Sequence, residues 1–367
     1  MITTLSIGSW NINGLGDKYR DDVFLSCLKY DINILLETWK GTDSNLNIPE
    51  FKTLQKCRKK QKRSKRFSGG IIILYKSKLH KGIHELSDVT TSQNRIWLKL
   101  DKYFFGFQKD LFVCACYIPP ANSPYYKDDF CQLESEISQL SHKGNILVIG
   151  DLNARIADKL DYIENEIDIH DTCTLQNLLP EDYSCDFNIA RNSLDKICNN
   201  QGQQLLDLCI ASQIRVLNGR FIGDIMGNLT CYKSNGASTV DYALADVNLM
   251  KNISFFQISD PSYLSDHAQI AVHIKCYISL NYMNSHNKPN FLNYSYKWEG
   301  ISKQKLLETL GEEKTIEEII EFENNVFQKN NPGIESAQKQ LADIFEHLAK
   351  RSCKLVKCFK KKKEGCN

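Results

Sequence analysis

The stretch Ser265-Asp266-His267-Ala268-Gln269-Ile270 places a carboxylate directly beside an imidazole. More than a hundred residues earlier, Ile149-Gly150-Asp151-Leu152-Asn153 places a second carboxylate and an amide in a turn that follows an apolar run. Hard oxygen ligands suit Mg²⁺, and a neighbouring carboxylate or imidazole serves a reacting oxygen that gains or loses a proton. Together these side chains are what metal-assisted cleavage of a phosphodiester requires.

The bulk composition is that of an ordinary globular protein. The chain has 367 residues, of which 42% are hydrophobic and 25% charged, and its formal net charge is +2. A net charge this close to zero gives no general attraction to polyanions, so any affinity for nucleic acid must come from local patches. The length exceeds that of one small domain.

The cysteines and the beginning of the chain bear on its compartment. The fourteen cysteines lie mostly inside apolar runs, where they behave as small buried hydrophobes. Neither Cys114/Cys116 nor Cys353/Cys358 has the second half that a zinc site needs. Residues 1–7 alternate like a strand and lack the pattern of a secretory signal, and no segment is long enough to span a membrane. We therefore expect reduced thiols and a nuclear or cytoplasmic protein that is neither secreted nor membrane-bound.

Short apolar runs ended by polar residues continue to about residue 276, which predicts one domain over residues 1–276. Helical spacing of apolar residues predicts helices outside the strands, over Asp22–Lys29, Asp129–Leu140 and Gln204–Ser212. Many strands that are apolar on both faces, with helices outside them, predict an α/β sandwich of two packed sheets flanked by helices. The predicted strands are Leu5–Asn11, Ile32–Leu36, Gly70–Tyr75, Ile96–Leu100, Leu111–Tyr117, Ile146–Ile149, Ile214–Asn218, Leu229–Lys233, Val240–Ala245 and Ile270–Ile274.

The composition changes after this domain. Residues 277–300 are rich in Asn, Ser and Lys and predict a linker. Residues 301–367 predict a helical, Lys-rich tail with helices over Lys303–Leu310 and Thr315–Phe322 and a final amphipathic run that includes Ala337 and Leu348. Four lysines at 360–363 follow this run.

Polar residues follow the first two predicted strands. Asn11 and Asn13 stand at i and i+2, so they leave the end of a strand on the same side, although a plain polar turn is an alternative. Glu37 comes directly after a buried apolar run, where an unpaired carboxylate is unfavourable. Glu37 is therefore a candidate Mg²⁺ ligand, with a solvated strand end as the alternative.

Later strands end in the same way. Tyr117 precedes a turn fixed by two prolines, and either a core tyrosine or a site residue fits there. Asp151 and Asn153 share one side of their turn. Asp241 begins a predicted strand, and a carboxylate that orients an imidazole such as His267 is a common arrangement in hydrolases.

These motifs, in this order, resemble the endonuclease/exonuclease/phosphatase superfamily, which includes DNase I, AP endonucleases and inositol polyphosphate 5-phosphatases. The resemblance covers about residues 4–275 and implies a four-layer, DNase I-like sandwich. The matching motifs are Trp10-Asn11-Ile12-Asn13-Gly14-Leu15, Glu37-Thr38, Tyr117-Ile118-Pro119-Pro120, Gly150-Asp151-Leu152-Asn153-Ala154-Arg155, Asp241-Tyr242 and Ser265-Asp266-His267.

Within this superfamily the chain most resembles the N-terminal endonuclease domain of LINE-type (non-LTR) retrotransposon polyproteins. That resemblance is carried by Asn13 where AP endonucleases have Asp, by Ser68-Gly69-Gly70-Ile71 and by Arg191-Asn192-Ser193-Leu194-Asp195-Lys196. The Pro-Ala-Trp-Cys-Asp-Arg block of inositol phosphatases is absent, since 237–241 reads Ala-Ser-Thr-Val-Asp. Pro120 stands where AP endonucleases have an Asn that contacts phosphate, which weighs against AP-site repair.

The resemblance also implies roles for individual residues. It implies Mg²⁺, with Mn²⁺ as an alternative, held by Glu37, Asn11 and Asp266. It implies that Asp151, aided by Asn153, positions and deprotonates the attacking water. His267, oriented by Asp241, and Tyr117 are implied to contact the phosphate. Whether Asp151 or His267 takes the water's proton stays open from the sequence. The further candidates for substrate contacts are Asn13, Arg155, Arg191, Thr230 and Ser238.

The predicted function is that of a Mg²⁺-dependent endonuclease that nicks one strand of DNA. The alternatives are a phosphatase or phosphodiesterase of the same fold acting on a small phosphoester, and a catalytically inert nucleic-acid-binding retroelement relic. In the basic segment 56–66, eight of eleven residues are Lys or Arg, which predicts a contact with DNA phosphates or an import signal. No feature of the sequence predicts an oligomeric state.

Overall fold

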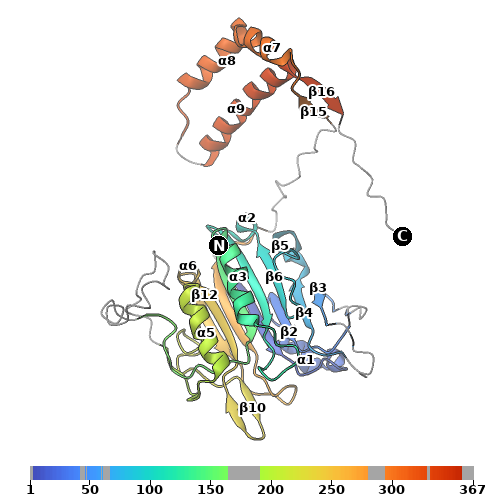
Figure 1. Ribbon diagram of the computed structural model, residues 1–367, viewed down its shortest axis with the longest axis vertical. Coiled ribbons are helices and arrows are strands. Elements are labelled where there is room, and N and C mark those ends of the chain that lie inside the picture. The colour runs from blue at the N-terminus through green and yellow to red at the C-terminus, as the bar shows by residue number, and fades with distance from the viewer. Residues whose placement is uncertain are drawn as a thin grey trace. The chain divides into compact units, whose positions relative to one another are not determined.

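The computed structural model describes residues 3–41, 46, 48–58, 60, 67–163, 191–279, 294–328 and 331–357. The chain divides into two compact units, Met1–Tyr282 and Met283–Asn367 (Figure 1).

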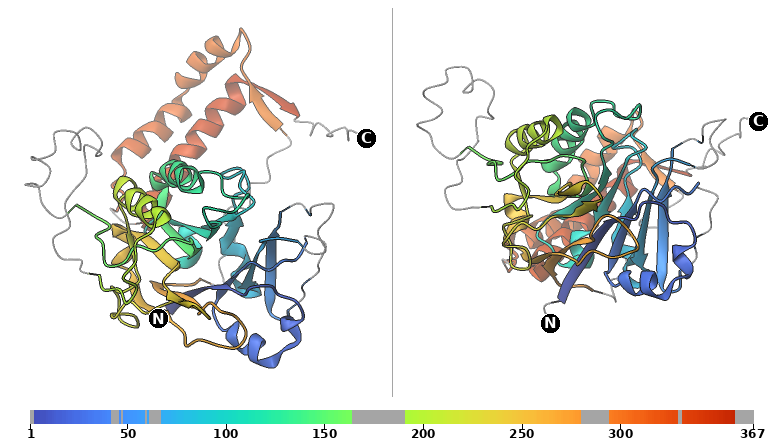
Figure 2. Two further views of the ribbon diagram at one scale, coloured as in Figure 1. Left: turned by 60° about the horizontal axis from the view of Figure 1, so that its bottom comes forward. Right: turned by 90° about the horizontal axis from the view of Figure 1, so that it is seen from below.

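The first unit contains two six-stranded sheets that face one another (Figure 2). The first sheet has the strand order β13-β14-β1-β2-β4-β3, and the second has the order β5-β6-β7-β8-β12-β9. The first is made of β1 (Thr3–Asn11), β2 (Ile32–Leu36), β3 (Phe51–Lys56), β4 (Ile71–Lys76), β13 (Ile253–Ile258) and β14 (Ile270–Cys276). The second is made of β5 (Ile83–Glu85), β6 (Arg95–Leu100), β7 (Asp110–Tyr117), β8 (Gly144–Asp151), β9 (Ile214–Val216) and β12 (Asp241–Asp246). A separate hairpin joins β10 (Cys231–Lys233) to β11 (Gly236–Ser238).

Helices cover the outer face of each sheet. The helical elements are η1 (Lys18–Arg20), α1 (Asp22–Cys27), η2 (Ser77–Gly82), α2 (Lys102–Phe105), α3 (Asp129–Ser141), α5 (Asn200–Ala211) and α6 (Val247–Met250). Leu133 of α3 and Leu205 of α5 pack against the second sheet, whereas Phe24 of α1 stacks on Trp10 of the first. The structure therefore has four layers, as the sequence predicts.

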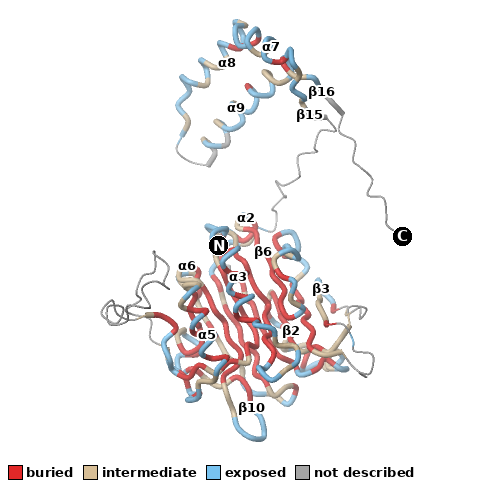
Figure 3. Tube along the Cα trace, viewed as in Figure 1, coloured by how far each residue is buried: buried red, intermediate tan, exposed pale blue. Residues whose placement is uncertain are grey.

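The core lies between the two sheets, where residues such as Ile7, Ile34, Val113 and Ile149 form one apolar cluster. Central strands are buried on both faces, which explains why all five residues of β2 are buried (Figure 3). This double burial makes the central strands visible in the sequence as continuous apolar runs.

All ten predicted strands are present, but the structure adds strands that the sequence pattern misses. β3 and β13 are the edge strands of the first sheet, and β5 is an edge strand of the second. The residues of β3 are only half-buried or exposed, so the strand shows no continuous apolar run. Edge strands are covered less completely than central ones, and their burial patterns are correspondingly mixed.

The second unit is small and largely helical. It contains β15 (Tyr294–Lys297), α7 (Ser302–Leu310), α8 (Glu313–Asn324), α9 (Asn331–Ser352) and β16 (Lys354–Lys357). α7 and α8 both contact α9, and β15 pairs antiparallel with β16. The range 277–300 predicted as a linker thus includes a strand, while the lysines at 360–363 lie outside the described residues. Among the described helices, none combines the length and the apolar character that crossing a membrane demands.

A buried arginine ties α3 to the second sheet. Arg95 of β6 is fully buried, and its guanidinium pairs with Asp129 Oδ1 and Glu136 Oε2 of α3, each at 2.9 Å. Trp97 Nε1 also donates to Glu136 Oε2, at 2.8 Å. These contacts hold the helix against the sheet whose strands β7 and β8 carry candidate site residues.

Arg95→Met is expected to lower the free energy of unfolding by about 3–5 kcal/mol, because it leaves two buried carboxylates without their cation. Urea denaturation measures the change. Lys99→Met is the matched control: Lys99 Nζ lies 2.8 Å from Asp110 Oδ2, but the lysine side chain is 32% exposed. Pairs in contact with solvent contribute about 1 kcal/mol or less, and this pair is partly exposed. Equal losses in the two variants would contradict the assignment of Arg95 as a structural anchor.

Candidate active site

The predicted site residues of both sheets meet at one end of the sandwich, where the strands β1, β2, β7 and β8 terminate. β1 and β2 run parallel, as do β7 and β8, so their carboxyl ends lie at a common edge. Asp151 at the end of β8 pairs in register with Tyr117 of β7 on one side and with Asp241 of β12 on the other. The pairing of the strands alone therefore places these three residues next to one another.

The amide of Asn11 connects the two sheets at this edge. Asn11 Nδ2 donates to Glu37 Oε1 at 3.1 Å and to Asp151 Oδ2 at 2.8 Å. Asn11 Oδ1 instead accepts from the backbone N–H of Asn13 at 3.0 Å. Asn11 thus presents its nitrogen, not its oxygen, to the carboxylates, and its role as a metal ligand stays a prediction.

Three predicted site residues have left-handed backbone conformations. The φ angles are +45° at Asn13, +50° at Glu37 and +48° at Asn153. Asparagine adopts this region readily, but glutamate does so at a cost of order 1–3 kcal/mol. Hydrogen bonds hold the turn at Glu37, whose carbonyl accepts from Gly14 N at 2.7 Å. Strain of this kind is typical of functional sites.

His267 is fixed on three sides. Its Nδ1 lies 2.8 Å from Asp241 Oδ2, its carbonyl accepts from Trp10 Nε1 at 2.8 Å, and its Nε2 lies 3.5 Å from Cys231 Sγ. Burial opposes the charged imidazole, but the adjacent carboxylate of Asp241 outweighs it and raises the pKa of His267 to about 12. His267 therefore carries a proton on each ring nitrogen at neutral pH.

Asp151 is a buried carboxylate whose pKa lies near neutrality, so it is suited to accept a proton where His267 is suited to donate one. Complete burial, and then the like charge of Asp241, raise the pKa of Asp151 from 3.8 to about 7. Hydrogen bonds from Asn11 Nδ2 and from the backbone N–H of Asn153, at 2.9 Å, act against this increase. A carboxylate with a pKa near neutrality is suited to accept a proton during a reaction.

Tyr117 is buried beside Glu37. Burial, and then the charges of Glu37 and Asp151, raise the pKa of the Tyr117 phenol far above its usual range, so it stays a hydrogen-bond donor. The guanidinium of Arg58 lies 5.5 Å from the Tyr117 ring centroid and 4.3 Å from that of Tyr125.

Arg58 is a site neighbour that the sequence did not single out. It belongs to the basic segment 56–66, yet it is only 7% exposed and donates from Nε and Nη2 to Asn94 Oδ1, at 2.9 and 2.7 Å. Nothing in a run of like charges indicates that Arg58 becomes buried. Residues 59 and 61–66 of this segment lie outside the described residues.

Two groups of side chains among the described residues bring three potential metal ligands within 4.8 Å of one another. One consists of Asp151, Asp241 and His267, and the other of Cys231, Asp266 and His267. Glu37 belongs to neither group. Asp266, a member of the second group, also accepts from Asn13 Nδ2 at 3.2 Å. Glu37 lies beside Asn11. The metal-ligand set of Glu37, Asn11 and Asp266 stays a prediction.

Glu37 nevertheless fits a bound Mg²⁺. Its strained backbone holds a half-buried carboxylate beside the amide nitrogen of Asn11, and a carboxylate is a hard oxygen ligand. Mg²⁺ in proteins usually takes one or two carboxylates and keeps several waters, so a dense ligand cage is not required.

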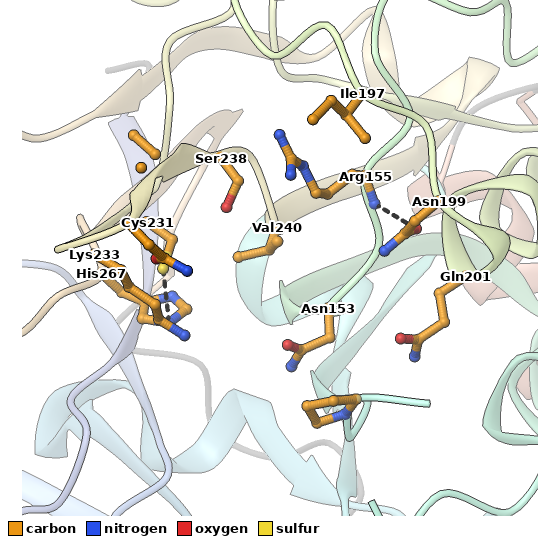
Figure 4. A pocket seen from close by; sticks show the side chains of 14 residues that line it. Asn153, Arg155, Ile197, Asn199, Gln201, Cys231, Lys233, Ser238, Val240 and His267 are labelled. Atoms are coloured by element: carbon orange, nitrogen blue, oxygen red, sulfur yellow. Dashed lines mark hydrogen bonds between the residues drawn. The ribbon is translucent and has the colours of Figure 1, made fainter. Parts of the chain in front are cut away.

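A pocket of about 460 Å³ opens beside His267 (Figure 4). Its lining includes Asn153, Arg155, Cys231, Lys233, Ser238 and His267. Arg155 is held by a bidentate ion pair in which Nε and Nη2 donate to Asp195 at 2.8 and 2.6 Å. The pocket thus combines cationic and amide side chains, which are suited to bind phosphate.

Arg191 and Thr230 make structural contacts. Arg191 Nη2 donates to the carbonyls of Ala157 and Lys159 at 2.7 and 2.8 Å. Thr230 Oγ1, which is completely buried, accepts from the backbone N–H groups of Val240 and Asp241, at 3.0 Å each. Their predicted contacts with substrate stay predictions, whereas Ser238 is half-buried in the pocket lining.

The overall structure is similar to known nucleases. The AP endonuclease LMAP from Leishmania major aligns with a TM-score of 0.53 at 12% identity, over 74% of this chain and 88% of that chain. The catalytic domain of APE2 from Xenopus laevis aligns with a TM-score of 0.52 at 18% identity, over 74% and 92%. The endonuclease domain of TRAS1, a telomere-specific non-LTR retrotransposon, aligns at 13% identity over 74% and 98%, but its TM-score of 0.46 supports no conclusion. No protein-family model and no curated protein matches the sequence.

Proposed function

Because the chain has the endonuclease/exonuclease/phosphatase fold, we propose that it is a Mg²⁺-dependent endonuclease that cuts one strand of DNA and leaves a 3′-hydroxyl. The observation that carries the proposal is the meeting of Asn11, Glu37, Asp151, Asp241 and His267 at one edge of the two sheets. The fold is shared with an AP endonuclease, which supports hydrolysis of a phosphodiester in DNA.

The electrostatics favour Asp151 as the general base. With a pKa raised to about 7, Asp151 can take the proton of an attacking water near neutral pH. His267 already carries its proton, so it instead donates from Nε2 to the phosphate and stabilises the charge that builds there. The phenol of Tyr117 supplies a second donor, and Glu37 is the carboxylate best suited to hold Mg²⁺. Mg²⁺ held by Glu37 would supply a Lewis acid for the charge that builds on the phosphate.

We further propose duplex DNA of the kind cut by retrotransposon endonucleases as the substrate. The motifs at 10–15, 68–71 and 191–196 support this choice, and Pro120 weighs against an abasic site. The basic segment 56–66 would add contacts with phosphates flanking the cut, which makes binding weaken as salt increases. The ten described cysteines are free thiols, in keeping with a reducing nuclear or cytoplasmic compartment.

Nicking of a supercoiled plasmid at low salt, with Mg²⁺ or with EDTA, tests the function. Mg²⁺-dependent conversion to open circles supports the proposal. A folded protein that binds Mg²⁺ but does not nick would instead point to a small phosphoester substrate. Absence of both nicking and Mg²⁺ binding would identify an inert relic.

Glu37→Gln is expected to abolish the stabilisation by Mg²⁺. An ion that binds only the folded state, at about 100 times its Kd, stabilises the protein by about 2.7 kcal/mol and raises its melting temperature. Differential scanning fluorimetry with and without Mg²⁺ measures this increase. Glu134→Gln, which alters an exposed carboxylate on α3, should leave the increase intact. An unchanged increase in Glu37→Gln would remove Glu37 from the metal site.

A further inference from the structure

Cys231 and His267 face one another across an isolated antiparallel bridge. The backbone bonds that define the bridge flank the pair: Tyr232 N donates to Asp266 O and Ala268 N donates to Thr230 O, each at 2.7 Å. In such a non-hydrogen-bonded pair the two side chains lie closer together than in a hydrogen-bonded one. The backbone therefore fixes the distance between a thiol and an imidazole.

The ligand atoms of this pair have the spacing of a zinc site. Cys231 Sγ lies 3.5 Å from His267 Nε2 (Figure 4). Bond lengths of about 2.3 Å to sulfur and 2.0–2.1 Å to nitrogen at a tetrahedral Zn²⁺ place these atoms about 3.6 Å apart. A carboxylate oxygen of Asp266 lies within 4.8 Å of both, and a small rotation of this partly exposed side chain would complete a set of three ligands.

The surroundings also suit a metal. His267 Nδ1 is held by Asp241 at 2.8 Å, which leaves Nε2 for a ligand, and a carboxylate behind a metal-binding imidazole is a usual feature of zinc sites. The pocket of about 460 Å³ is lined by both Cys231 and His267 and gives an ion a path to them. Lys233 forms a loose ion pair with Asp266: its Nζ lies 3.9 Å from Oδ2, and its side chain is 58% exposed.

We propose that Zn²⁺ binds to Cys231, His267 and Asp266 and thereby inhibits the enzyme. Sulfur and imidazole favour Zn²⁺ over Mg²⁺. This set shares Asp266 with the predicted Mg²⁺ ligands but includes neither Glu37 nor Asn11. On binding, the thiol and the Nε2 position each release their proton to solvent, and the metal forms bonds to Sγ, Nε2 and a carboxylate oxygen. The inhibitory role rests on the proposed function, because zinc would occupy the Nε2 position from which His267 is proposed to donate to the phosphate. Zinc binding itself does not depend on that function.

A simple thiol–imidazole hydrogen bond also accounts for a distance of 3.5 Å, so the test must detect a metal–sulfur bond. Co²⁺ is a suitable probe because it enters zinc sites and gives a thiolate-to-cobalt charge-transfer band in the near ultraviolet. The reduced, metal-free full chain is titrated with Co²⁺ and then with Zn²⁺. We expect the wild type to show a band that Zn²⁺ removes. Cys231→Ser should bind one equivalent of Co²⁺ fewer under the same conditions, because its affinity at this site falls at least about 100-fold. Loss of a residue that only supports a metal ligand costs at most about that much.

Cys131→Ser is the matched control, since Cys131 is an exposed thiol on α3. It should bind Co²⁺ as the wild type does. His267→Gln provides an independent variant that removes the nitrogen ligand and should lose the same equivalent. An absent band in the wild type, or an undiminished one in Cys231→Ser and His267→Gln, would overturn the proposal.

The nicking assay separates inhibition from function. At saturating Mg²⁺, micromolar Zn²⁺ should inhibit the wild type and Cys131→Ser. Cys231→Ser should need far more zinc to be inhibited, when each protein is compared with its own rate without zinc. If no protein nicks DNA even without zinc, but the cobalt charge-transfer band still requires Cys231, the proposed function is refuted and the zinc site is retained. Equal inhibition of Cys231→Ser and the wild type would refute the inhibitory role.

Discussion

Asp151→Asn is expected to lower the nicking rate by about 10²–10⁴-fold, the contribution usual for a general base, and at the same time to stabilise the fold. The rate falls because an amide cannot accept the proton of the attacking water. The fold gains because the variant removes a completely buried carboxylate that lies beside Asp241.

The difference in stability between Asp151→Asn and the wild type should depend on pH in a defined direction. The pKa of Asp151 is raised from 3.8 to about 7 in the folded protein, so its ionisation destabilises the fold. This penalty is absent below pH 3.8, grows as pH rises and is complete above about 7. In EDTA, the melting temperature of Asp151→Asn should therefore exceed that of the wild type by an amount that increases between these limits. A gap that shrinks with rising pH, or full activity in the variant, would rule out this role.

Asp241→Asn is expected to reduce nicking by up to about 10⁴-fold, the loss seen when the carboxylate of a hydrolase triad becomes an amide. In the proposed mechanism Asp241 is a positioning residue, which acts by accepting from His267 Nδ1 at 2.8 Å. Without that acceptor, His267 loses both its orientation and the charge that holds its second proton.

A double-mutant cycle with His267→Ala tests this dependence. If Asp241 acts through His267, adding Asp241→Asn to His267→Ala should change kcat little further, since residues that act as a unit are not additive. Asp246→Asn, at the other end of β12, is the control, because asparagine can still cap α6 there. Fully additive losses would show that Asp241 has a separate function, for example through its like charge on Asp151.

The sequence predicts the sandwich and the edge where the candidate residues gather, for a physical reason. Central strands are buried on both faces and appear as continuous apolar runs, and polar residues at their ends, such as Asn11, Glu37 and Asp151, must lie at the sheet edge. The edge strands β3 and β13 escape prediction because they are covered less completely.

Individual contacts are harder to predict because they depend on the path of loops. Arg191 and Thr230 have the residue types of DNA contacts, and the structure adds backbone contacts that the sequence does not reveal. Their contacts with substrate stay predictions. Arg58 looks like any other charge in its run, yet it is buried between aromatic rings. Cys231 looks like another core cysteine, and the bridge to His267 places it beside the candidate site residues.

The pairing of β1 with β14 has a consequence for synthesis. Residues 3–9 at the start of the domain pair with residues 270–276 at its end, and His267 lies immediately before that last strand. A chain that stops short of β14 lacks the imidazole, and one side of β1 has no neighbour. During synthesis on a ribosome, β1 can pair with β14 only after nearly the whole domain has emerged. The proposed cutting of DNA would therefore require that the two ends of the domain have met.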